Sequence, residues 1–257
     1  MAKSRFEYVK HFEADDRLLP HCWIVVRVDG KGFTSFAEEH AFEKPNDVRA
    51  LGLMDKCARE VMQVFDDIRL AYGESDEYSF VFSKTSILYG RRSSKLVSLV
   101  TSCFTSSYVR FWAQFFPETE LRRTPIFDGR AVCYPTDAIL RDYLAWRQAD
   151  THINNQYNTC FWALVKSGKS RAEANQALQG TQTAFKNELL YTTFGINYST
   201  LPAIFRKGSV ILRTKSSRVV DHLVDGTPVE QETNAPTVCH DDIISNSFWD
   251  QHPELLA

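Results

Sequence analysis

Apolar residues along the chain follow two different spacings, and the first half of the sequence alternates between them. Continuous apolar runs, which are typical of buried strands, occupy residues 22–29, 68–72, 78–82 and 126–134. Apolar residues three and four positions apart, which predict amphipathic helices, occupy residues 47–65 and 93–116. The order strand, helix, strand, strand, helix, strand predicts a ferredoxin-like split βαβ fold of the α+β class, with four antiparallel strands and both helices on one face.

The second half changes to a mainly helical pattern after Pro135. Helices are predicted over residues 137–148, 152–166, 171–179 and 182–193. Thr136 and Thr151 are suited to cap the first two. Beyond these helices we expect a strand over residues 209–214 and a solvated hairpin or loop over residues 219–238. The tail, residues 240–257, is acidic and is expected to be partly ordered. Residues 1–135 and 136–257 are expected to form two parts that pack together as one unit.

Composition narrows the class of protein. The chain has 257 residues, of which 44% are hydrophobic and 24% charged, which excludes a disordered chain or a coiled coil. The formal net charge of −2 excludes a protein that coats DNA non-specifically. The six cysteines form no CxxC pair and favour buried, reduced thiols over zinc ligands. With no apolar stretch of about 20 residues and no targeting signal, we expect a cytoplasmic or nuclear protein without a membrane partner.

Two acidic segments carry the candidate chemistry. Asp29 ends a buried strand and is followed by a glycine turn over residues 30–32, while Glu74, Asp76 and Glu77 crowd a hairpin turn. Alone, the first segment fits a tight turn and the second a solvated hairpin tip. Split βαβ pairing, however, places Asp29 beside Asp76, and paired carboxylates without His or Cys favour Mg²⁺, which also binds substrate phosphates. Two such ions would suit displacement at phosphorus.

The sequence resembles the tRNA-His guanylyltransferases, which add nucleotides in the 3′-to-5′ direction. The segments that carry the resemblance are Arg27-Val28-Asp29-Gly30-Lys31-Gly32-Phe33, Ser75-Asp76-Glu77-Tyr78-Ser79-Phe80 and His152-Ile153-Asn154-Asn155. It extends from Ser4 to about Lys215. It implies a palm domain like that of polymerases over residues 1–135 and a helical, basic, tRNA-binding half over residues 136–257.

The resemblance also implies a reaction and its ligands. ATP adenylylates the 5′-phosphate of tRNA-His, the 3′-hydroxyl of GTP displaces AMP, and pyrophosphate is then removed to leave guanosine at position −1. Two Mg²⁺ ions are expected on the side chains of Asp29 and Asp76 and the carbonyl of Gly30. The nucleoside triphosphate is expected to contact Asp29, Gly30, Lys31, Gly32, Phe33, Thr34, Lys44, Ser75, Asp76 and Arg92.

Further residues are assigned by type and position. Glu77 is expected beside the metals, and Lys95, with Arg92 at the start of a long helix, beside a phosphate. Taken singly, such cations more often belong to a solvated surface. The residues expected to contact tRNA are His152, Asn154, Asn155, Lys186 and Lys207. A homotetramer, built as a dimer of dimers with one tRNA across subunits, follows from the resemblance; DNA is not an expected partner.

Two other functions compete with this prediction. A palm-domain nucleotide cyclase would share the sheet and the acidic turn, but it would lack the helical and basic half. A catalytically inactive RNA-binding protein would not need both Asp29 and Asp76.

Overall fold

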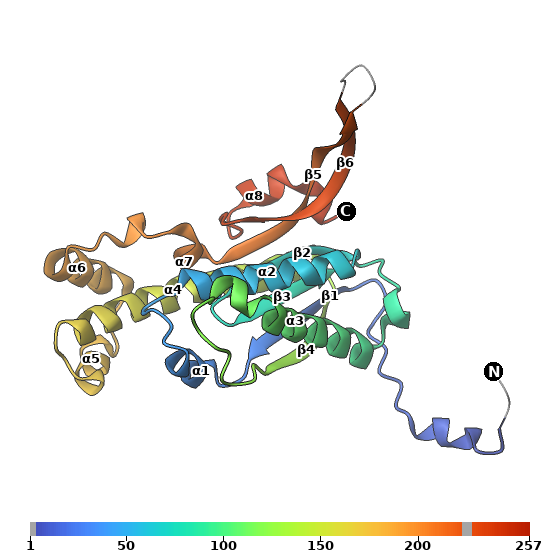
Figure 1. Ribbon diagram of the computed structural model, residues 1–257, viewed down its shortest axis with the longest axis horizontal. Helices are drawn as coiled ribbons and strands as arrows, with labels where there is room; N and C mark the ends of the chain where they lie inside the picture. The colour runs from blue at the N-terminus through green and yellow to red at the C-terminus, as the bar shows by residue number, and fades with distance from the viewer. Residues whose placement is uncertain (1–3, 223–227) are drawn as a thin grey trace.

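The computed structural model describes residues 4–222 and 228–257 of the chain. Their centre is one antiparallel sheet in the order β4-β1-β3-β2-β5-β6 (Figure 1). The strands are β1 (Trp23–Gly30), β2 (Ile68–Glu74), β3 (Glu77–Phe82), β4 (Phe127–Tyr134), β5 (Ser209–His222) and β6 (Pro228–Cys239). The first four strands confirm the predicted split βαβ order, and the β5–β6 hairpin adds two more at the β2 edge.

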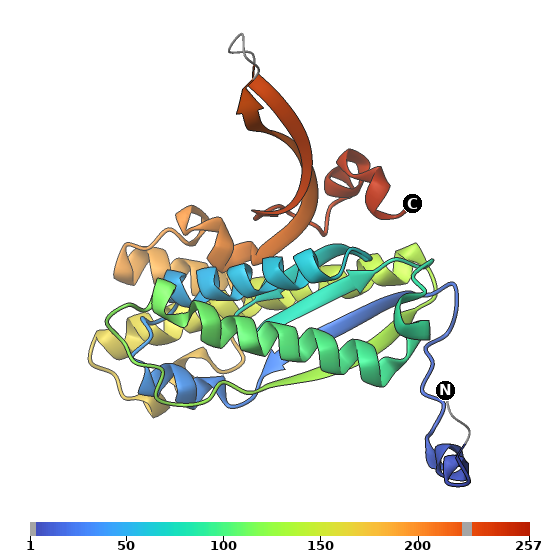
Figure 2. The same cartoon turned by 45° about the vertical axis from the view of Figure 1, so that its right-hand side comes forward.

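Two long helices, α2 (Val48–Val64) and α3 (Ser93–Phe115), cover one face of this sheet (Figure 2). Asp47 caps α2 by accepting a hydrogen bond from the backbone N–H of Arg49 at 2.9 Å. The layer between helices and sheet is filled by fully buried apolar side chains, including Leu53, Val61 and Phe104. Burying each such side chain stabilises the fold by about 1.5–3 kcal/mol.

The opposite face of the sheet is covered as well. The first half of α4 (Asp137–Lys166) and the short α8 (Asn246–Gln251) pack there. The buried side chains of this second core include Trp23, Val25, Leu70, Tyr72, Val81, Leu140, Leu144, Phe248 and Trp249. The prediction of a partly ordered acidic tail was therefore wrong, because Phe248 and Trp249 bind it to the sheet; η4 (Pro253–Leu255) follows α8.

The helical half is built around α4. The two predicted helices 137–148 and 152–166 are one continuous helix. Thr136 caps it as predicted, but the Thr151 hydroxyl donates to the carbonyl of Arg147, one turn back, and lets the helix continue. A third core joins α4 to α5 (Arg171–Leu178), α6 (Thr183–Phe194) and η3 (Tyr198–Thr200). The short α7 (Ala203–Lys207) leads into β5.

The strand predicted over 209–214 is longer than expected. Backbone pairing with β6 continues to His222, so most of the expected hairpin or loop over 219–238 is regular strand, and residues 223–227 of that range lie outside the described residues. This hairpin extends away from the body of the molecule (Figures 1 and 2).

The N-terminal segment also leaves the body, carrying η1 (Glu7–Phe12), while η2 (Leu88–Arg91) precedes α3 (Figure 1). None of the residues of η1 is buried. Among the described helices, none combines the length and apolar character needed to cross a membrane. All six cysteines are free thiols, but only Cys57 and Cys160 are fully buried, and the other four are partly exposed.

Candidate functional site

The tip of the β2–β3 hairpin meets the end of β1. The turn consists of Ser75 and Asp76, since Glu74 pairs with Glu77. The backbone N–H of Gly30 donates to the carbonyl of Asp76 at 2.9 Å, and Asp29 is paired with Glu77 across the strands. The structure therefore brings Asp29 and Asp76 together, as the strand order predicted.

These carboxylates lie in surroundings that disfavour negative charge. Burial is the main cause that raises the pKa of Asp76 to about 6, and the nearby charge of Asp29 adds to it against a hydrogen bond from Ser75. Burial likewise raises the pKa of Glu74 to about 7. A bound cation would favour the ionised form of both groups.

The donor set fits Mg²⁺. Within the described residues no group of three or more His, Cys, Asp and Glu side chains forms a metal cage. Mg²⁺ does not require one, because it keeps several waters and takes one or two carboxylates together with substrate phosphates. Asp29 and Asp76, with the carbonyl of Gly30, are the groups that could hold such an ion.

Glu77 was expected beside the metals, but its carboxylate forms ion pairs with two arginines. Arg147 of α4 donates to both of its carboxylate oxygens, at 3.0 and 3.2 Å, and Arg27 of β1 lies 3.8 Å away. Arg147 also contacts Asp150 and stacks over the Trp146 ring at 3.9 Å. Glu77 is therefore a link between the hairpin and α4. No sequence pattern pointed to Arg147, because an arginine within a helix is usually solvated.

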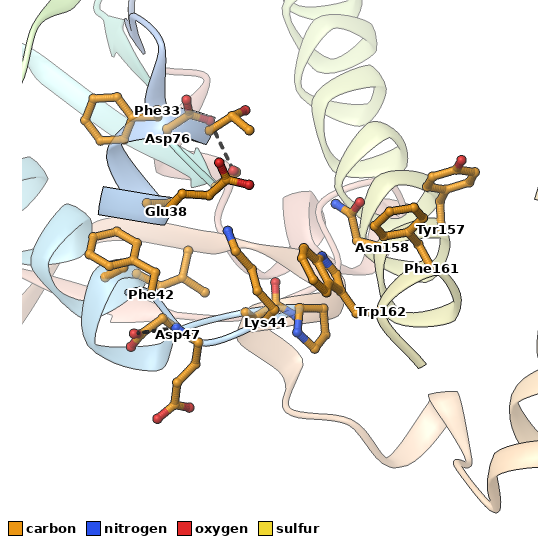
Figure 3. Close-up of a pocket in the computed structure, with 18 of the residues that line it drawn as sticks. Phe33, Glu38, Phe42, Lys44, Asp47, Asp76, Tyr157, Asn158, Phe161 and Trp162 are labelled. Atoms are coloured by element: carbon orange, nitrogen blue, oxygen red, sulfur yellow. Dashed lines mark hydrogen bonds between the residues drawn. The ribbon is translucent and has the colours of Figure 1, made fainter. Parts of the chain in front are cut away.

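A cavity of about 440 Å³ opens beside Asp76 (Figure 3). One wall comes from α1 (Phe33–Glu39) and the segment after it, and the other from α4. Its apolar lining includes Phe33, Ala37, Phe42, Tyr108, Phe161 and Trp162. Lys44 lies between the walls, with its ammonium 5.9 Å from the centre of the Trp162 ring. Aromatic walls, a cation and adjacent carboxylates suit a nucleotide with its metal-bound phosphates.

A second cavity of about 300 Å³ lies against the same hairpin tip and is mostly polar. Its polar lining consists of Asn46, Glu74, Ser75, Asp76, Glu77, Arg147, Asp150, Thr151, Asn154, Asn155 and Asn158. Asp76 lines both cavities, so two different ligands can reach this carboxylate.

A short helix follows directly after the predicted glycine turn. Residues 33–39 form α1, which the sequence pattern did not reveal, and Gly32 precedes it with φ of 70°. The N–H of Gly30 and the N–H of Lys31 already donate to the carbonyls of Asp76 and Ile126. These two amides therefore have protein acceptors, and the predicted contacts of Gly30 and Lys31 with the triphosphate stay a prediction.

Arg92 and Lys95 do not join the site within one chain. Both lie at the first turn of α3, and Tyr108, the residue of α3 that lines the first cavity, is about 20 Å further along the helix. Arg92 pairs instead with Asp16 at 3.4 Å, and the Lys95 ammonium lies 5.8 Å from the centre of the Tyr89 ring.

The residues predicted to contact tRNA are divided between surface and interior. Asn154 is exposed and lines the polar cavity, but Asn155 is 6% exposed and bonds Asn46 and Tyr198. Lys186 is 8% exposed and donates to the Thr181 carbonyl at 2.7 Å. Asn155 also lines the polar cavity. Both residues make internal hydrogen bonds, while their predicted contacts with tRNA stay a prediction.

His152 and Lys207 lie away from the acidic turn. The half-buried His152 packs edge-on against Tyr198 and lines a separate hollow with Arg206. The Lys207 carbonyl accepts hydrogen bonds from Tyr72 and Gln148, while its side chain is partly exposed.

Comparison with known proteins agrees with this geometry. A family model described as "tRNAHis guanylyltransferase" matches residues 6–135. The chain belongs to the tRNA-His guanylyltransferase family. A second model of this family, "Thg1 C terminal domain", matches residues 138–245.

Relatives named for this family cover the whole chain. A Mus musculus protein, "Probable tRNA(His) guanylyltransferase", is 52% identical, and the alignment covers 89% of that protein. The Arabidopsis thaliana protein "tRNA(His) guanylyltransferase 2" is 55% identical, but the chain spans 48% of its length.

Solved structures of the family share the fold. The tRNA-His guanylyltransferase from Saccharomyces cerevisiae is 48% identical, with a TM-score of 0.78 over 81% of this chain and 93% of that one. A bacterial guanylyltransferase-like protein, solved in complex with ATP, has a TM-score of 0.78 at 20% identity and covers 98% of this chain and 99% of its own. The second likeness concerns the fold alone.

Proposed function

We propose that this protein adds guanosine to position −1 of tRNA-His in the 3′-to-5′ direction. Adenylylation of the 5′-phosphate by ATP comes first, attack by the 3′-hydroxyl of GTP follows, and pyrophosphate removal ends the reaction. The observation that carries the proposal is Asp76, which lines both cavities and lies beside the end of β1 that carries Asp29, in a chain about 50% identical to proteins named for this activity.

Asp29, Asp76 and the Gly30 carbonyl would hold two Mg²⁺ ions. When bound, these ions supply charge neutralisation at the attacked phosphorus. The burial of Asp76 supports this role, because an ion pair in poorly solvated surroundings is stronger than one in water. Arg27 and Arg147 hold Glu77 in place, so the acidic turn keeps one shape before substrate arrives.

The two cavities suggest how the substrates divide. We assign the aromatic cavity with Lys44 to the nucleotide, ATP or GTP, because stacking surfaces and a cation suit a base and its phosphates. We assign the polar cavity to the 5′ end of the tRNA, because the Asn154 and Asn158 amides and the Arg147 guanidinium can bond phosphate and ribose.

We also infer that the active form is a homotetramer and that it acts in the cytoplasm, the nucleus or both. Four large side chains of the N-terminal segment support assembly: Phe6, Tyr8, Val9 and Phe12 are 60%, 61%, 53% and 82% exposed. The anticodon of a tRNA lies far from its 5′ end, so we infer that a second subunit reads the anticodon, where unpaired bases are accessible.

An anticodon transplant tests this proposal. A different tRNA that receives the GUG anticodon should become a substrate, and the rate should depend on Mg²⁺. Asp29→Ala and Asp76→Ala should each abolish turnover with the melting temperature preserved. Unchanged relative rates after the transplant would contradict anticodon reading, and cyclic product from GTP alone would support the cyclase instead.

A further inference from the structure

A row of paired residues crosses the sheet directly behind the acidic turn. Tyr78 on β3 pairs with Gly73 on β2, and Gly73 pairs with Ser209 on β5. The Tyr78 ring occupies the space that a side chain at position 73 would fill, since a Cβ there would lie 2.2 Å from the ring. The glycine thus allows the Tyr78 hydroxyl to reach across β2 toward β5.

The hydroxyl groups at the two ends of this row both donate hydrogen bonds to Asp55 of α2. Its Oδ1 accepts a hydrogen bond from the Tyr78 hydroxyl at 2.7 Å, and its Oδ2 accepts one from the Ser209 hydroxyl at 3.0 Å. Tyr78 is 1% exposed and Ser209 is 2% exposed, so these bonds are shielded from water. One carboxyl group therefore fixes β3 and β5 to α2 at the end of the sheet that carries the turn.

The turn itself needs support from outside the hairpin. Ser75 has φ of 49°, in the left-handed region that a residue with a Cβ adopts at a cost of about 1–2 kcal/mol. Two-residue hairpin turns favour glycine or asparagine at such positions. Strained backbone of this kind persists only when the surrounding structure holds it. The bond from Gly30 to the Asp76 carbonyl holds it on the β1 side, and Tyr78 is the nearest anchored residue on the α2 side.

We propose that Asp55 is a positioning residue for the metal-binding turn. Through its hydrogen bond to Tyr78, it holds the hairpin so that the Asp76 carboxylate stays beside that of Asp29. The role is indirect, because Asp55 acts through Tyr78 on a segment two residues away. The inference rests on the proposed function, in which Asp29 and Asp76 share divalent cations.

Two conservative variants test it in the full-length protein. Tyr78→Phe removes one hydroxyl, and Asp55→Asn keeps the shape of the side chain while removing its charge. Each is expected to weaken the binding of Mn²⁺ alone, measured by electron paramagnetic resonance, about fivefold, and to lower kcat about tenfold, because small displacements of reacting groups are costly. The double variant should match Tyr78→Phe, since Asp55→Asn only weakens the bond by making its acceptor neutral, whereas Tyr78→Phe removes the bond.

Gly73→Ala is a third variant, which disturbs the position of the Tyr78 ring through steric overlap. Its Cβ would displace the Tyr78 ring, so the same loss of Mn²⁺ affinity is expected without any change in Asp55 or in the Tyr78 hydroxyl. This variant also keeps the test decisive if Asp55→Asn does not fold.

Tyr143→Phe is the matched control. It removes a buried hydroxyl that bonds Ser79, the next residue of β3, at 2.7 Å. It should lower the melting temperature with Mn²⁺ affinity unchanged. The proposal is overturned if Tyr78→Phe and Asp55→Asn bind Mn²⁺ like the wild type while Asp76→Ala does not, or if Tyr143→Phe weakens Mn²⁺ binding equally. Unchanged binding by Asp76→Ala would overturn the metal site itself.

Discussion

Asp76 and Glu77 are neighbours in sequence, yet the fold gives their carboxylates different surroundings. Glu77 faces α4 and receives two hydrogen bonds from Arg147, whereas Asp76 accepts one from the Ser75 hydroxyl at 3.1 Å. Burial raises the pKa of both groups, but the arginines oppose the rise at Glu77. Glu77 is thus committed to structure, and Asp76 is the group with capacity for a cation.

Glu74 should make the metal-free protein less stable at high pH. Its pKa is raised in the folded state from 4.5 to about 7, so stability is fully present below about pH 4.5 and is lost as the pH rises through 7. With a chelator present, Glu74→Gln should raise the free energy of unfolding by about 2 kcal/mol at pH 8 and much less at pH 5.

Urea unfolding at both pH values measures this difference. Glu39→Gln, at an exposed position of α1, serves as the control and should change stability by less than about 0.5 kcal/mol at either pH. An equal effect of Glu74→Gln at pH 5 and pH 8 would contradict the burial argument.

At the scale of elements, α4 connects the parts of the site. Its first turns pack Leu140 and Leu144 on the sheet, its middle places Arg147 against the acidic hairpin, and its last turns supply Phe161 and Trp162 to the aromatic cavity. Because the helix is continuous through Thr151, these contacts are held in a fixed relation. A break at Thr151, as the sequence suggested, would have separated the hairpin contact from the cavity wall.

The ion pair between Arg147 and Glu77 is the contact of α4 that should matter most for stability. Both side chains are largely buried, with 6% and 13% exposed. Removing one partner leaves a buried charge, so Arg147→Met should lower the free energy of unfolding by about 3 kcal/mol. The double variant Arg147→Met/Glu77→Gln should lose less than the sum of the single variants. Denaturant melts of the four proteins measure this coupling; strict additivity would contradict it.

Structural features that depend on a short stretch of sequence could be predicted, whereas features that depend on tertiary packing could not. The apolar runs of β1 to β4 and the Thr136 cap are local patterns, and each was predicted. The proximity of Asp29 to Asp76 was predicted from the order of the strands in the sheet. Arg147, the burial of Lys186 and the remote position of Lys95 depend on which side of a helix faces the core, which residue type alone does not show.

At the scale of the whole molecule, the sheet buries apolar side chains on both faces. The face toward α2 and α3 is built mainly by the first half of the chain, while the second face is covered by α4 and the C-terminal segment. The predicted division at residues 135 and 136 therefore separates four strands of the sheet from β5, β6 and one covering layer. We propose that the two halves depend on each other for folding.

A fragment of residues 1–135 should accordingly fail to fold as a stable monomer. It would expose Trp23, Val25, Leu70, Tyr72 and Val81, each at most 2% exposed in the full chain. Exposed apolar patches of this kind promote aggregation. Circular dichroism and dye binding on the purified fragment measure the outcome. A fragment that unfolds cooperatively and remains monomeric would contradict the mutual dependence.

The central claim is that the acidic turn of this chain catalyses 3′-to-5′ nucleotide addition. The most direct measurement is incubation with 5′-phosphorylated tRNA-His, ATP, labelled GTP and Mg²⁺, followed by mapping of the tRNA 5′ end. We expect one guanosine at position −1, an adenylylated 5′ end when GTP is omitted, and neither product with Asp76→Ala. Label at any other position, or equal incorporation by Asp76→Ala, would contradict it.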